Sequence, residues 1–328
     1  MKELAAELRK YKQVYVVCDR NVIGFARRIR HDNLLAITAD EAHKTIDTVM
    51  DICHWLCDCG ADRDALVLAV GGGVTTDMAG FAASIYKRGI RYANIPTTLL
   101  SMVDAGIGGK TGVNLDGYKN LLGVIRQPEF TAIFPEVLET LPERELRSGL
   151  AEMLKTFIIK NPRNAYERTI AEGPTPELIQ LAAGIKQEIV EKDEFEGGIR
   201  RKLNLGHTWA HAIEWWQKGS FAGARNDRRF ARNDTPFTHG EAVAIGMVQA
   251  AKYAERHGLA EEPGLADRIA KDLKACGLPT ALPCPAEELL PAILKDKKTY
   301  GSKIKLVLPL RIGKVAVKTV PSESIAEA

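Results

Sequence analysis

Residues 65–77, with the sequence ALVLAVGGGVTTD, run from an apolar segment through three glycines to a polar segment. A short apolar run that ends at turn residues is typical of a buried strand, so we predict a strand over 65–73 and a helix over 78–87. Glycines let the backbone approach a ligand closely, and the N-terminus of a helix favours phosphate. The run is neither GxGxxG nor a Walker loop, so two interpretations of Gly71, Gly72 and Gly73 stay open, a phosphate site and a tight turn. Asp77 can accept a hydrogen bond from a ribose or an amide, or it can cap the helix.

The flanking segments repeat this alternation of strand and helix. Apolar runs bounded by turn residues predict strands at 14–19, 34–38, 92–98 and 130–134, and an apolar stripe predicts a helix at 41–58. Asp19 and Asn21 follow the first strand, at the edge where open α/β sheets bind ligands. The alternation predicts an α/β fold, with a mostly parallel sheet that has helices on both faces.

A glycine-rich segment, residues 99–120, follows the strand at 92–98. It contains the polar residues Asp104, Lys110, Asn114, Lys119 and Asn120. A loop with two lysines and small residues suits a phosphorylated or anionic substrate. The alternative is a surface loop whose lysines are solvated.

From about residue 144 the pattern changes to helices. We expect helices at 144–160 and 175–192, two more within 261–296, and a final hairpin over 296–320. Pro142 marks the boundary, so the predicted domains are an α/β domain, 1–143, and a mainly helical domain, 144–328. Residues 217–237 interrupt the helical pattern and are interpreted as a solvated loop, or alternatively as a lid over an anion.

The second half also contains candidate metal ligands. His207 and His211, in the segment IRRKLNLGHTWAHAIE (199–214), share one face of a predicted helix. Glu152 lies on an apolar helix, where a carboxylate is costly to bury unless it is paired or binds a metal. With His239 these residues can supply one carboxylate and two imidazoles to a catalytic zinc. Spacing does not decide between His207 and His211.

Composition excludes some classes of function. The chain has 328 residues and a net charge of +3, which gives no reason to expect nucleic acid or a membrane as a partner. The first residues, MKELAAELRKYK, lack the apolar core of a signal peptide. The spacing of the six cysteines fits no usual zinc pattern, so we expect reduced thiols and a cytoplasmic protein.

Taken together, the motifs resemble the 3-dehydroquinate synthase family, within the sugar-phosphate cyclases. The segments that carry this resemblance are GGGVTTDMAGFAASIYKRGI (71–90), IPTTLLSMVDAGIGGKTGVN (95–114), KNLLG (119–123), TLPERE (140–145), GLAEMLK (149–155), LNLGHTWAHAIE (203–214), HGEAVAIGM (239–247) and DKK (296–298). They span nearly the whole chain, and several are long and specific.

The resemblance implies a role for individual residues. It implies Glu152, His207 and His239 as ligands of Zn²⁺ or Co²⁺, His211 as a proton-transfer residue, and Glu196 as a further acid–base residue. The implied NAD contacts are Asp19, Asn21, Glu41, Lys44, Gly71, Gly72, Gly73, Asp77, Thr97, Thr98, Lys119 and Thr140. The implied substrate contacts are Arg88, Asp104, Lys110, Asn120, Lys155, Lys186, Arg200, Asn204 and Lys297.

The resemblance also implies a reaction. Its substrate is a seven-carbon deoxy keto sugar phosphate, which is transiently oxidised by NAD, loses phosphate, is reduced again and closes by an internal aldol step to 3-dehydroquinate. A homodimer is expected, with residues 1–143 binding NAD and residues 144–328 binding metal and substrate. Two alternatives stay open, a cyclase for a different sugar phosphate and a metal- and NAD-dependent polyol dehydrogenase.

The chain departs from the family pattern in a few places. Phe134 stands where relatives usually have Asp, Tyr118 replaces a usual Gly, and Phe195 replaces a usual Arg. The leading strand segment looks shortened, and the 217–237 segment is longer than usual. None of these departures removes an implied ligand or base. They bear on the nucleotide contacts near 118–140.

Overall fold

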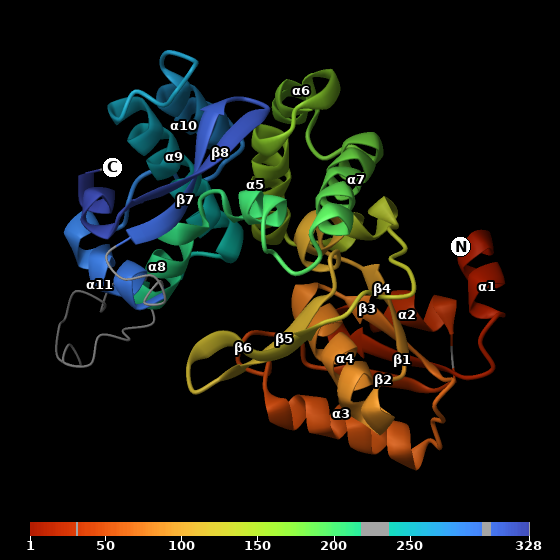
Figure 1. Cartoon of the computed structure of the whole chain (residues 1–328). Helices are drawn as coiled ribbons and strands as arrows, with labels where there is room; N and C mark the ends of the chain where they lie inside the picture. The colour runs from red at the N-terminus through yellow and green to blue at the C-terminus, as the bar shows by residue number, and fades with distance from the viewer. Residues whose placement is uncertain (31, 218–235, 297–302, 328) are drawn as a thin grey trace. The chain divides into compact units, whose positions relative to one another are not determined.

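The computed structural model describes residues 1–30, 32–217, 236–296 and 303–327 (Figure 1). The chain forms two compact units. The first comprises Met1–Pro142 and Ile179–Phe195, and the second comprises Glu143–Leu178 and Glu196–Ala328. This grouping differs from the predicted division at 143/144, because residues 179–195 return to the first unit. The assignment of the two predicted domains to NAD and to metal stays a prediction.

A four-stranded parallel sheet forms the centre of the first unit. Its strands are β1 (Val14–Asp19), β2 (Leu34–Ile37), β3 (Leu66–Gly71) and β4 (Arg91–Pro96), in the order β2-β1-β3-β4. All pairings are parallel, so the carboxyl ends of the strands meet at one edge. The predicted parallel α/β architecture is confirmed.

Both faces of this sheet are buried. Along β1, Tyr15 and Val17 belong to one hydrophobic cluster, whereas Val14 and Val16 belong to another, as alternate side chains of a strand must. Helices α3 (Ile46–Asp58) and α4 (Gly73–Ile85) supply the first cluster. Helices α1 (Lys2–Leu8) and α2 (Ile23–Ile29) supply the second.

The fifth predicted strand, at 130–134, was wrong. Residue Thr131 makes only an isolated parallel bridge with Asn94 of β4. A 3₁₀ helix begins immediately afterwards, at Pro135–Thr140, and ends any ladder. The segment is apolar because Phe130, Ala132 and Phe134 pack against the core beside the sheet.

The predicted loop 99–120 was also partly wrong, because its second half forms a hairpin. Strands β5 (Lys110–Leu115) and β6 (Tyr118–Ile125) pair antiparallel. Asp116 and Gly117 form the turn with φ of 49° and 81°. Positive φ at both central residues is the geometry that a two-residue hairpin favours, and Asp-Gly is its sequence signal.

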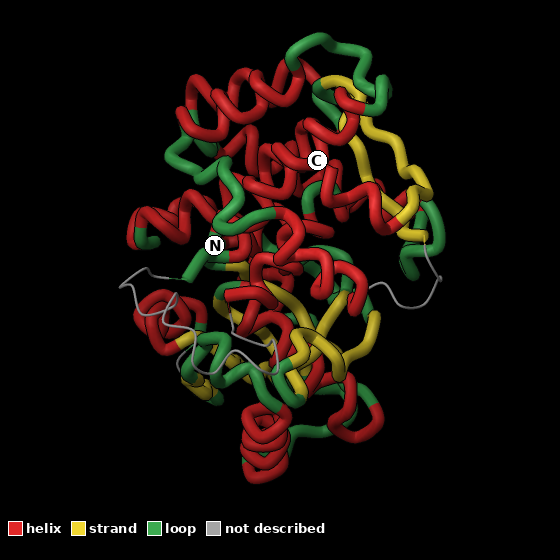
Figure 2. The backbone as a smooth tube through the Cα atoms, turned by 90° about the vertical axis from the view of Figure 1, so that its left-hand side faces the viewer, coloured by secondary structure: helices red, strands yellow, loops and turns green. Residues whose placement is uncertain are grey.

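Helices make up most of the second unit (Figure 2). They are α5 (Glu143–Ile159), α6 (Ala165–Glu172), α8 (His207–Gln217), α9 (His239–Arg256), α10 (Leu265–Ala275) and α11 (Ala286–Asp296). The predicted final hairpin is confirmed as β7 (Lys303–Arg311) and β8 (Lys314–Pro321). Helix α7 (Pro176–Lys192) begins in the second unit and continues in the first.

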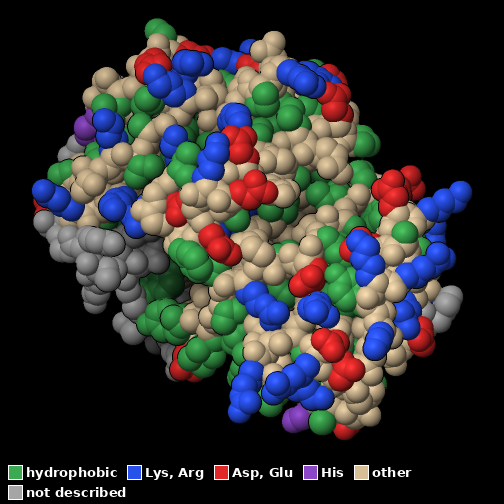
Figure 3. Space-filling view, turned by 45° about the vertical axis from the view of Figure 1, so that its right-hand side comes forward, with side chains coloured by type: hydrophobic (Ala, Val, Ile, Leu, Met, Phe, Trp, Pro, Cys, Tyr) green, Lys and Arg blue, Asp and Glu red, His purple; other side chains and the backbone are tan. Residues whose placement is uncertain are grey.

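The surface shows no accumulation of one charge on the face drawn in Figure 3, where Lys and Arg are interspersed with Asp and Glu. Within the described residues, no helix is both long enough and apolar enough to cross a membrane. All six cysteines have free thiols.

Helix α9 packs against α5, α8 and α10, and glycines bring it unusually close to two of these neighbours. A Cβ atom on Gly240 would lie 2.0 Å from the backbone oxygen of Ser148 in α5. A Cβ atom on Gly246 would lie 2.0 Å from the backbone oxygen of Gly206, directly before α8. Only glycine fits at these crossings without backbone movement.

We therefore expect Gly246→Ala to destabilise the protein by about 1–3 kcal/mol or more, because the methyl group displaces backbone rather than a flexible side chain. Gly184→Ala in α7 is the matched control. A Cβ at Gly184 meets nothing within 4 Å, so this change should stabilise by about 0.5–1 kcal/mol through helix propensity alone. Urea unfolding midpoints measure both, and equal midpoints for the two variants would contradict the close crossing.

Candidate active site

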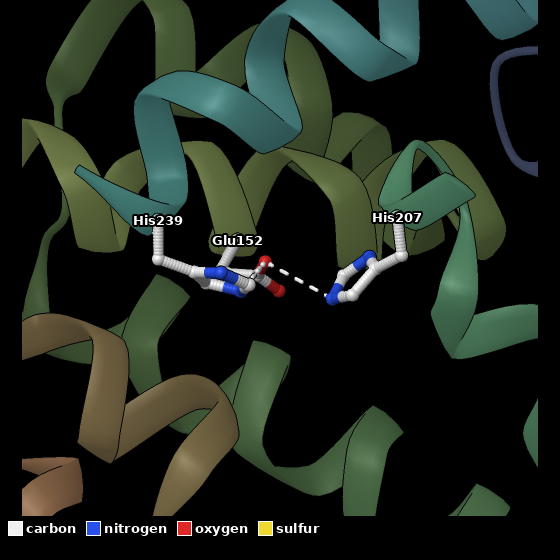
Figure 4. Close-up of side chains that lie close together, drawn as sticks. All are labelled: Glu152, His207 and His239. Carbon is white, nitrogen blue, oxygen red and sulfur yellow. Dashed lines mark ion pairs between the residues drawn. The ribbon is translucent and has the colours of Figure 1, made fainter. Parts of the chain in front are cut away.

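Three side chains from three helices of the second unit point toward one another (Figure 4). Glu152 lies in the middle of α5, His207 is the first residue of α8, and His239 is the first residue of α9. Thr238 caps α9 by a reciprocal pair of hydrogen bonds with Glu241, which fixes where the helix begins.

The geometry of this trio suits a metal. Each residue offers one ligand atom, and these atoms all lie within 4.8 Å of one another. The Glu152 Oε1 atom is 3.4 Å from the Nε2 atom of His239 and 3.8 Å from that of His207. One carboxylate and two imidazoles leave a coordination position open, as catalytic zinc sites do.

Burial and charge also favour a cation here. Glu152 is completely buried, and its carboxylate forms an ion pair with the Nζ atom of Lys155 and lies close to the imidazoles of His207 and His239. Burial raises the pKa of Glu152, but Lys155 and His239 outweigh burial and hold the pKa well below its usual range. The side chain is therefore a buried anion that Lys155 and His239 stabilise, and a metal ion at the imidazoles would add further positive charge beside it.

The two imidazoles differ in charge. Burial and the neighbouring Lys155 hold the pKa of His207 well below its usual value, so this ring is neutral and can bind a metal. Burial also lowers the pKa of His239, but the Glu152 and Glu214 carboxylates raise it to about 10. Positive charge is thus favoured at His239, where a metal ion would supply it.

Hydrogen bonds on the far side of each ring orient its Nε2 atom toward the centre. The Nδ1 atom of His207 lies 3.1 Å from the backbone oxygen of Leu205, and that of His239 lies 3.0 Å from the Oε1 atom of Glu214. Both partners are acceptors, so each Nδ1 atom donates. The Nε2 atom of the neutral His207 is free for a ligand, and that of His239, which lies 3.4 Å from Glu152, would be free once a metal ion replaced its proton. The residues present therefore fit a divalent metal.

His211 lies beside this group without belonging to it. Its ring centre is 5.5 Å from that of His207, with the two rings perpendicular, and the side chain is exposed. The geometry therefore brings His207, rather than His211, to Glu152 and His239, a choice that spacing left open.

Other residues predicted to contact substrate surround the trio or lie along the same unit. Lys155 is buried and forms an ion pair with Glu152. Arg200 is buried in the 3₁₀ helix Ile199–Asn204. Asn204 donates a hydrogen bond to the carboxylate of Glu196, whose φ is 60°. Lys297 and most of the 217–237 segment lie outside the described residues.

In the first unit, several of the residues predicted to contact NAD lie at or just after the carboxyl ends of the sheet strands. Asp19 follows β1 and accepts a hydrogen bond from the backbone of Asn21. Gly71 ends β3, Gly72 precedes α4 and Gly73 begins it, so the three glycines form a strand-to-helix turn. Thr97 and Thr98 follow β4, and the backbone of Thr97 donates to that of Gly71. Thr140 ends the 3₁₀ helix after residue 134.

A second cluster of this unit connects residues predicted to contact NAD with one predicted to contact substrate. Lys44 is buried, and its Nζ atom donates to Asp77 at 2.6 Å and to Asn120 at 2.5 Å. Asp77 is in the second turn of α4, so it does not cap this helix. Burial raises the pKa of Asp77, and Lys44 opposes this effect.

Asn114, to which the sequence analysis gave no individual role, connects Glu41 with Asn120 in this cluster. Its side-chain amide donates to Glu41 at 2.9 Å, and its side-chain oxygen accepts from the backbone of Asn120 at 2.9 Å. Asn120 has a φ of 50°, a strained conformation that neighbouring bonds must hold in place. Lys119 approaches Glu41 at 4.0 Å.

The remaining predicted substrate contacts are also in the first unit. The Nζ atom of Lys186 donates to the carboxylate and to the backbone oxygen of Asp104, the latter at 2.6 Å. Lys110 is exposed at the start of β5. Arg88 is exposed, has a φ of 69°, and lines a surface cavity with Arg63 and Lys87.

For the Asn114 cluster we expect Asn114→Ala to loosen the hairpin. The change removes the acceptor for the Asn120 amide, and a hydrogen bond of this kind contributes about 0.5–1.5 kcal/mol, so hydrogen exchange in 118–125 should rise up to about tenfold. Exchange followed by mass spectrometry measures this. Gln127→Ala, which removes a bond to Glu194 outside the hairpin, should leave these peptides unchanged. Unaltered exchange in Asn114→Ala would show that Asn114 does not hold the hairpin.

Comparisons with known proteins agree with this arrangement. Residues 34–148 match the family model for the 3-dehydroquinate synthase N-terminal region, and residues 149–299 match the model for its C-terminal region. A 3-dehydroquinate synthase of Dictyoglomus thermophilum is 40% identical over 299 residues, which cover 88% of this chain and 79% of that protein.

Solved structures give the same result. The 2-epi-5-epi-valiolone synthase of Streptomyces hygroscopicus subsp. jinggangensis 5008, with NAD⁺ and Zn²⁺ bound, superposes with a TM-score of 0.84 at 29% identity, over 99% of this chain and 92% of that one. A 2-deoxy-scyllo-inosose synthase complexed with carbaglucose-6-phosphate, NAD⁺ and Co²⁺ superposes with a TM-score of 0.83 at 25% identity, over 99% and 93%. The two family models together cover most of the sequence, and the chain belongs to the 3-dehydroquinate synthase family.

Proposed function

We propose that the chain is a 3-dehydroquinate synthase, a carbon–oxygen lyase that converts 3-deoxy-D-arabino-heptulosonate 7-phosphate to 3-dehydroquinate and phosphate. The observation that carries this proposal is the convergence of Glu152, His207 and His239, because these are the residues that the family resemblance implies as metal ligands. The 40% identity to a 3-dehydroquinate synthase over most of the chain supports the choice of substrate.

The proposed cofactors are NAD and one divalent metal ion, Zn²⁺ or Co²⁺. When bound, NAD removes and returns a hydride, while the metal polarises the alcohol that is oxidised. Glu152, His207 and His239 would hold the metal, with the anionic carboxylate of Glu152 and the neutral ring of His207 as donors. The polar edge at the carboxyl ends of β1, β3 and β4 would hold the dinucleotide, as such edges do in open parallel sheets.

Charged residues would orient the substrate and move its protons. Lysines and arginines hold phosphate and carboxylate groups through charge-assisted hydrogen bonds, the role proposed for Lys110, Lys186 and Arg200. We assign proton exchange to the exposed imidazole of His211, and the 5.5 Å between its ring centre and that of His207 supports this role. Glu196, held by Asn204, is the second acid–base candidate.

A cyclase that acts on another sugar phosphate is the second candidate, which the similarity to a 2-epi-5-epi-valiolone synthase favours.

We also propose a homodimer in the cytoplasm. The homodimer rests on the family resemblance, and the six free cysteines suit a reducing compartment.

The assay for the function combines the protein, NAD⁺, Zn²⁺ and the heptulosonate phosphate. We expect stoichiometric release of inorganic phosphate with no lasting NADH absorbance, because the hydride returns within one turnover. Lasting NADH would instead indicate a dehydrogenase. If other sugar phosphates release phosphate faster than this one does, the second candidate replaces the first.

The roles of the two neighbouring histidines can be separated by substitution. His207→Ala should abolish metal content, whereas His211→Ala should retain the metal and lower turnover by roughly 100-fold or more, as loss of a general acid–base group does. Metal analysis of the purified proteins and the phosphate assay give both readings. Equal loss of metal in both variants would overturn these assignments.

A further inference from the structure

Glu214 is a buried carboxylate that the proposed reaction does not use. Its residue is 5% exposed, and its Oε1 atom lies 3.0 Å from the Nδ1 atom of His239. An ionised carboxylate is costly to bury unless it is paired or hydrogen-bonded. Its contact with a proposed metal ligand therefore suggests a role in the metal site.

The position of Glu214 on its helix supports this role. Glu214 lies seven residues after His207 and three after His211, so α8 presents all three side chains along one face. The first would bind the metal, the second would transfer a proton, and the third contacts the ligand that α9 supplies. One helix face thus connects two of the three proposed ligands.

The orientation of His239 depends on what its Nδ1 atom contacts. An imidazole ring with one proton carries it on either nitrogen, and a carboxylate at Nδ1 selects the form in which Nε2 is free. The His239 ring also lies near Glu152, whose Oε1 atom is 3.4 Å from its Nε2 atom, and near the ring of His207, but Glu214 is the contact at its Nδ1 atom. By comparison, the ring of His207 is held by a neutral backbone oxygen, that of Leu205.

We propose that Glu214 is a positioning residue of the metal site. It accepts the proton-bearing Nδ1–H of His239, keeps the Nε2 atom directed at the metal, and adds a negative charge behind that ligand. The positive charge of Lys155 next to Glu152 weakens the attraction of the site for a dication, and Glu214 offsets it. Carboxylates that accept hydrogen bonds from ligating histidines typically contribute about 10–100-fold to metal affinity.

The inference rests on the proposed metal site, so its test measures metal binding without turnover. Apo protein is titrated with Zn²⁺ against a chromophoric chelator, for the wild type, Glu214→Gln and Glu214→Ala. Glutamine keeps the volume and an acceptor oxygen but loses the charge, so its affinity should fall about tenfold, and alanine should cost up to about 100-fold. The absorption bands of the Co²⁺-loaded protein should change in both variants, because the geometry of His239 changes.

Glu255→Gln is the matched control. Glu255 is on the same helix as His239, near its opposite end, and accepts a hydrogen bond from the backbone of Ala266. A general effect of removing a helix-anchoring carboxylate would appear in this variant too, whereas a positioning role predicts unchanged zinc affinity and unchanged Co²⁺ bands. If the alanine variant does not fold, the nearly isosteric glutamine variant decides.

Wild-type zinc affinity in Glu214→Gln, or equal losses in Glu214→Gln and Glu255→Gln, would overturn the inference. A wild type that binds zinc tightly but releases no phosphate from the heptulosonate would refute the proposed function and leave the result on Glu214 standing. A wild type with no affinity for zinc would refute both.

Discussion

The metal site depends on how closely three helices approach. The candidate ligand atoms come from α5, α8 and α9 and lie within 4.8 Å of one another, so the way these helices pack decides whether the atoms meet. Gly240 against Ser148 and Gly246 against Gly206 provide close crossings. The candidate ligands are next to them in sequence: His239 precedes Gly240, His207 follows Gly206, and Glu152 is one helical turn after Ser148. The close crossings and the candidate donors therefore occupy the same parts of these helices.

This packing creates an electrostatic demand. Glu152 is a fully buried anion, and neighbouring groups supply positive charge, through Lys155 and through a proton on His239. Glu152, His207 and His239 would hold a dication, which would supply positive charge at the same place. In the first unit the charges are compensated internally instead, since Lys44 pairs with Asp77 and Lys186 pairs with Asp104.

Local patterns in the sequence predicted the sheet well. The strands at 14–19 and 65–73 are short apolar runs that end at turn residues. A strand that is buried on both faces needs apolar side chains at nearly every position, so its sequence is a continuous apolar run. The same rule failed at 130–134, where apolar residues cover the edge of the core without joining the ladder. A buried strand and a buried segment beside the sheet both require apolar residues, so the sequence pattern does not distinguish them.

The site residues were harder to predict from local patterns. His207 and His211 are on one helix face, so the packing of α5, α8 and α9 decides which of them reaches Glu152, and sequence spacing does not contain this information. The hairpin at Asp116-Gly117 could have been predicted, because this dipeptide is a signal for a hairpin turn. The surrounding glycines instead favoured the interpretation as a loop. The sequence shows that Glu214 lies on the same helix face as His207. Its possible role follows only from its contact with His239, which the sequence does not show.

The course of α7 has a consequence for dividing the chain. The backbone passes from one unit to the other three times, after Pro142, after Leu178 and after Phe195. A chain cut once at Pro142 would separate Asp104 from Lys186, its ion-pair partner. The first fragment would then lack residues 179–195 of its own unit, which the second fragment would carry, so a single cut does not separate the two units.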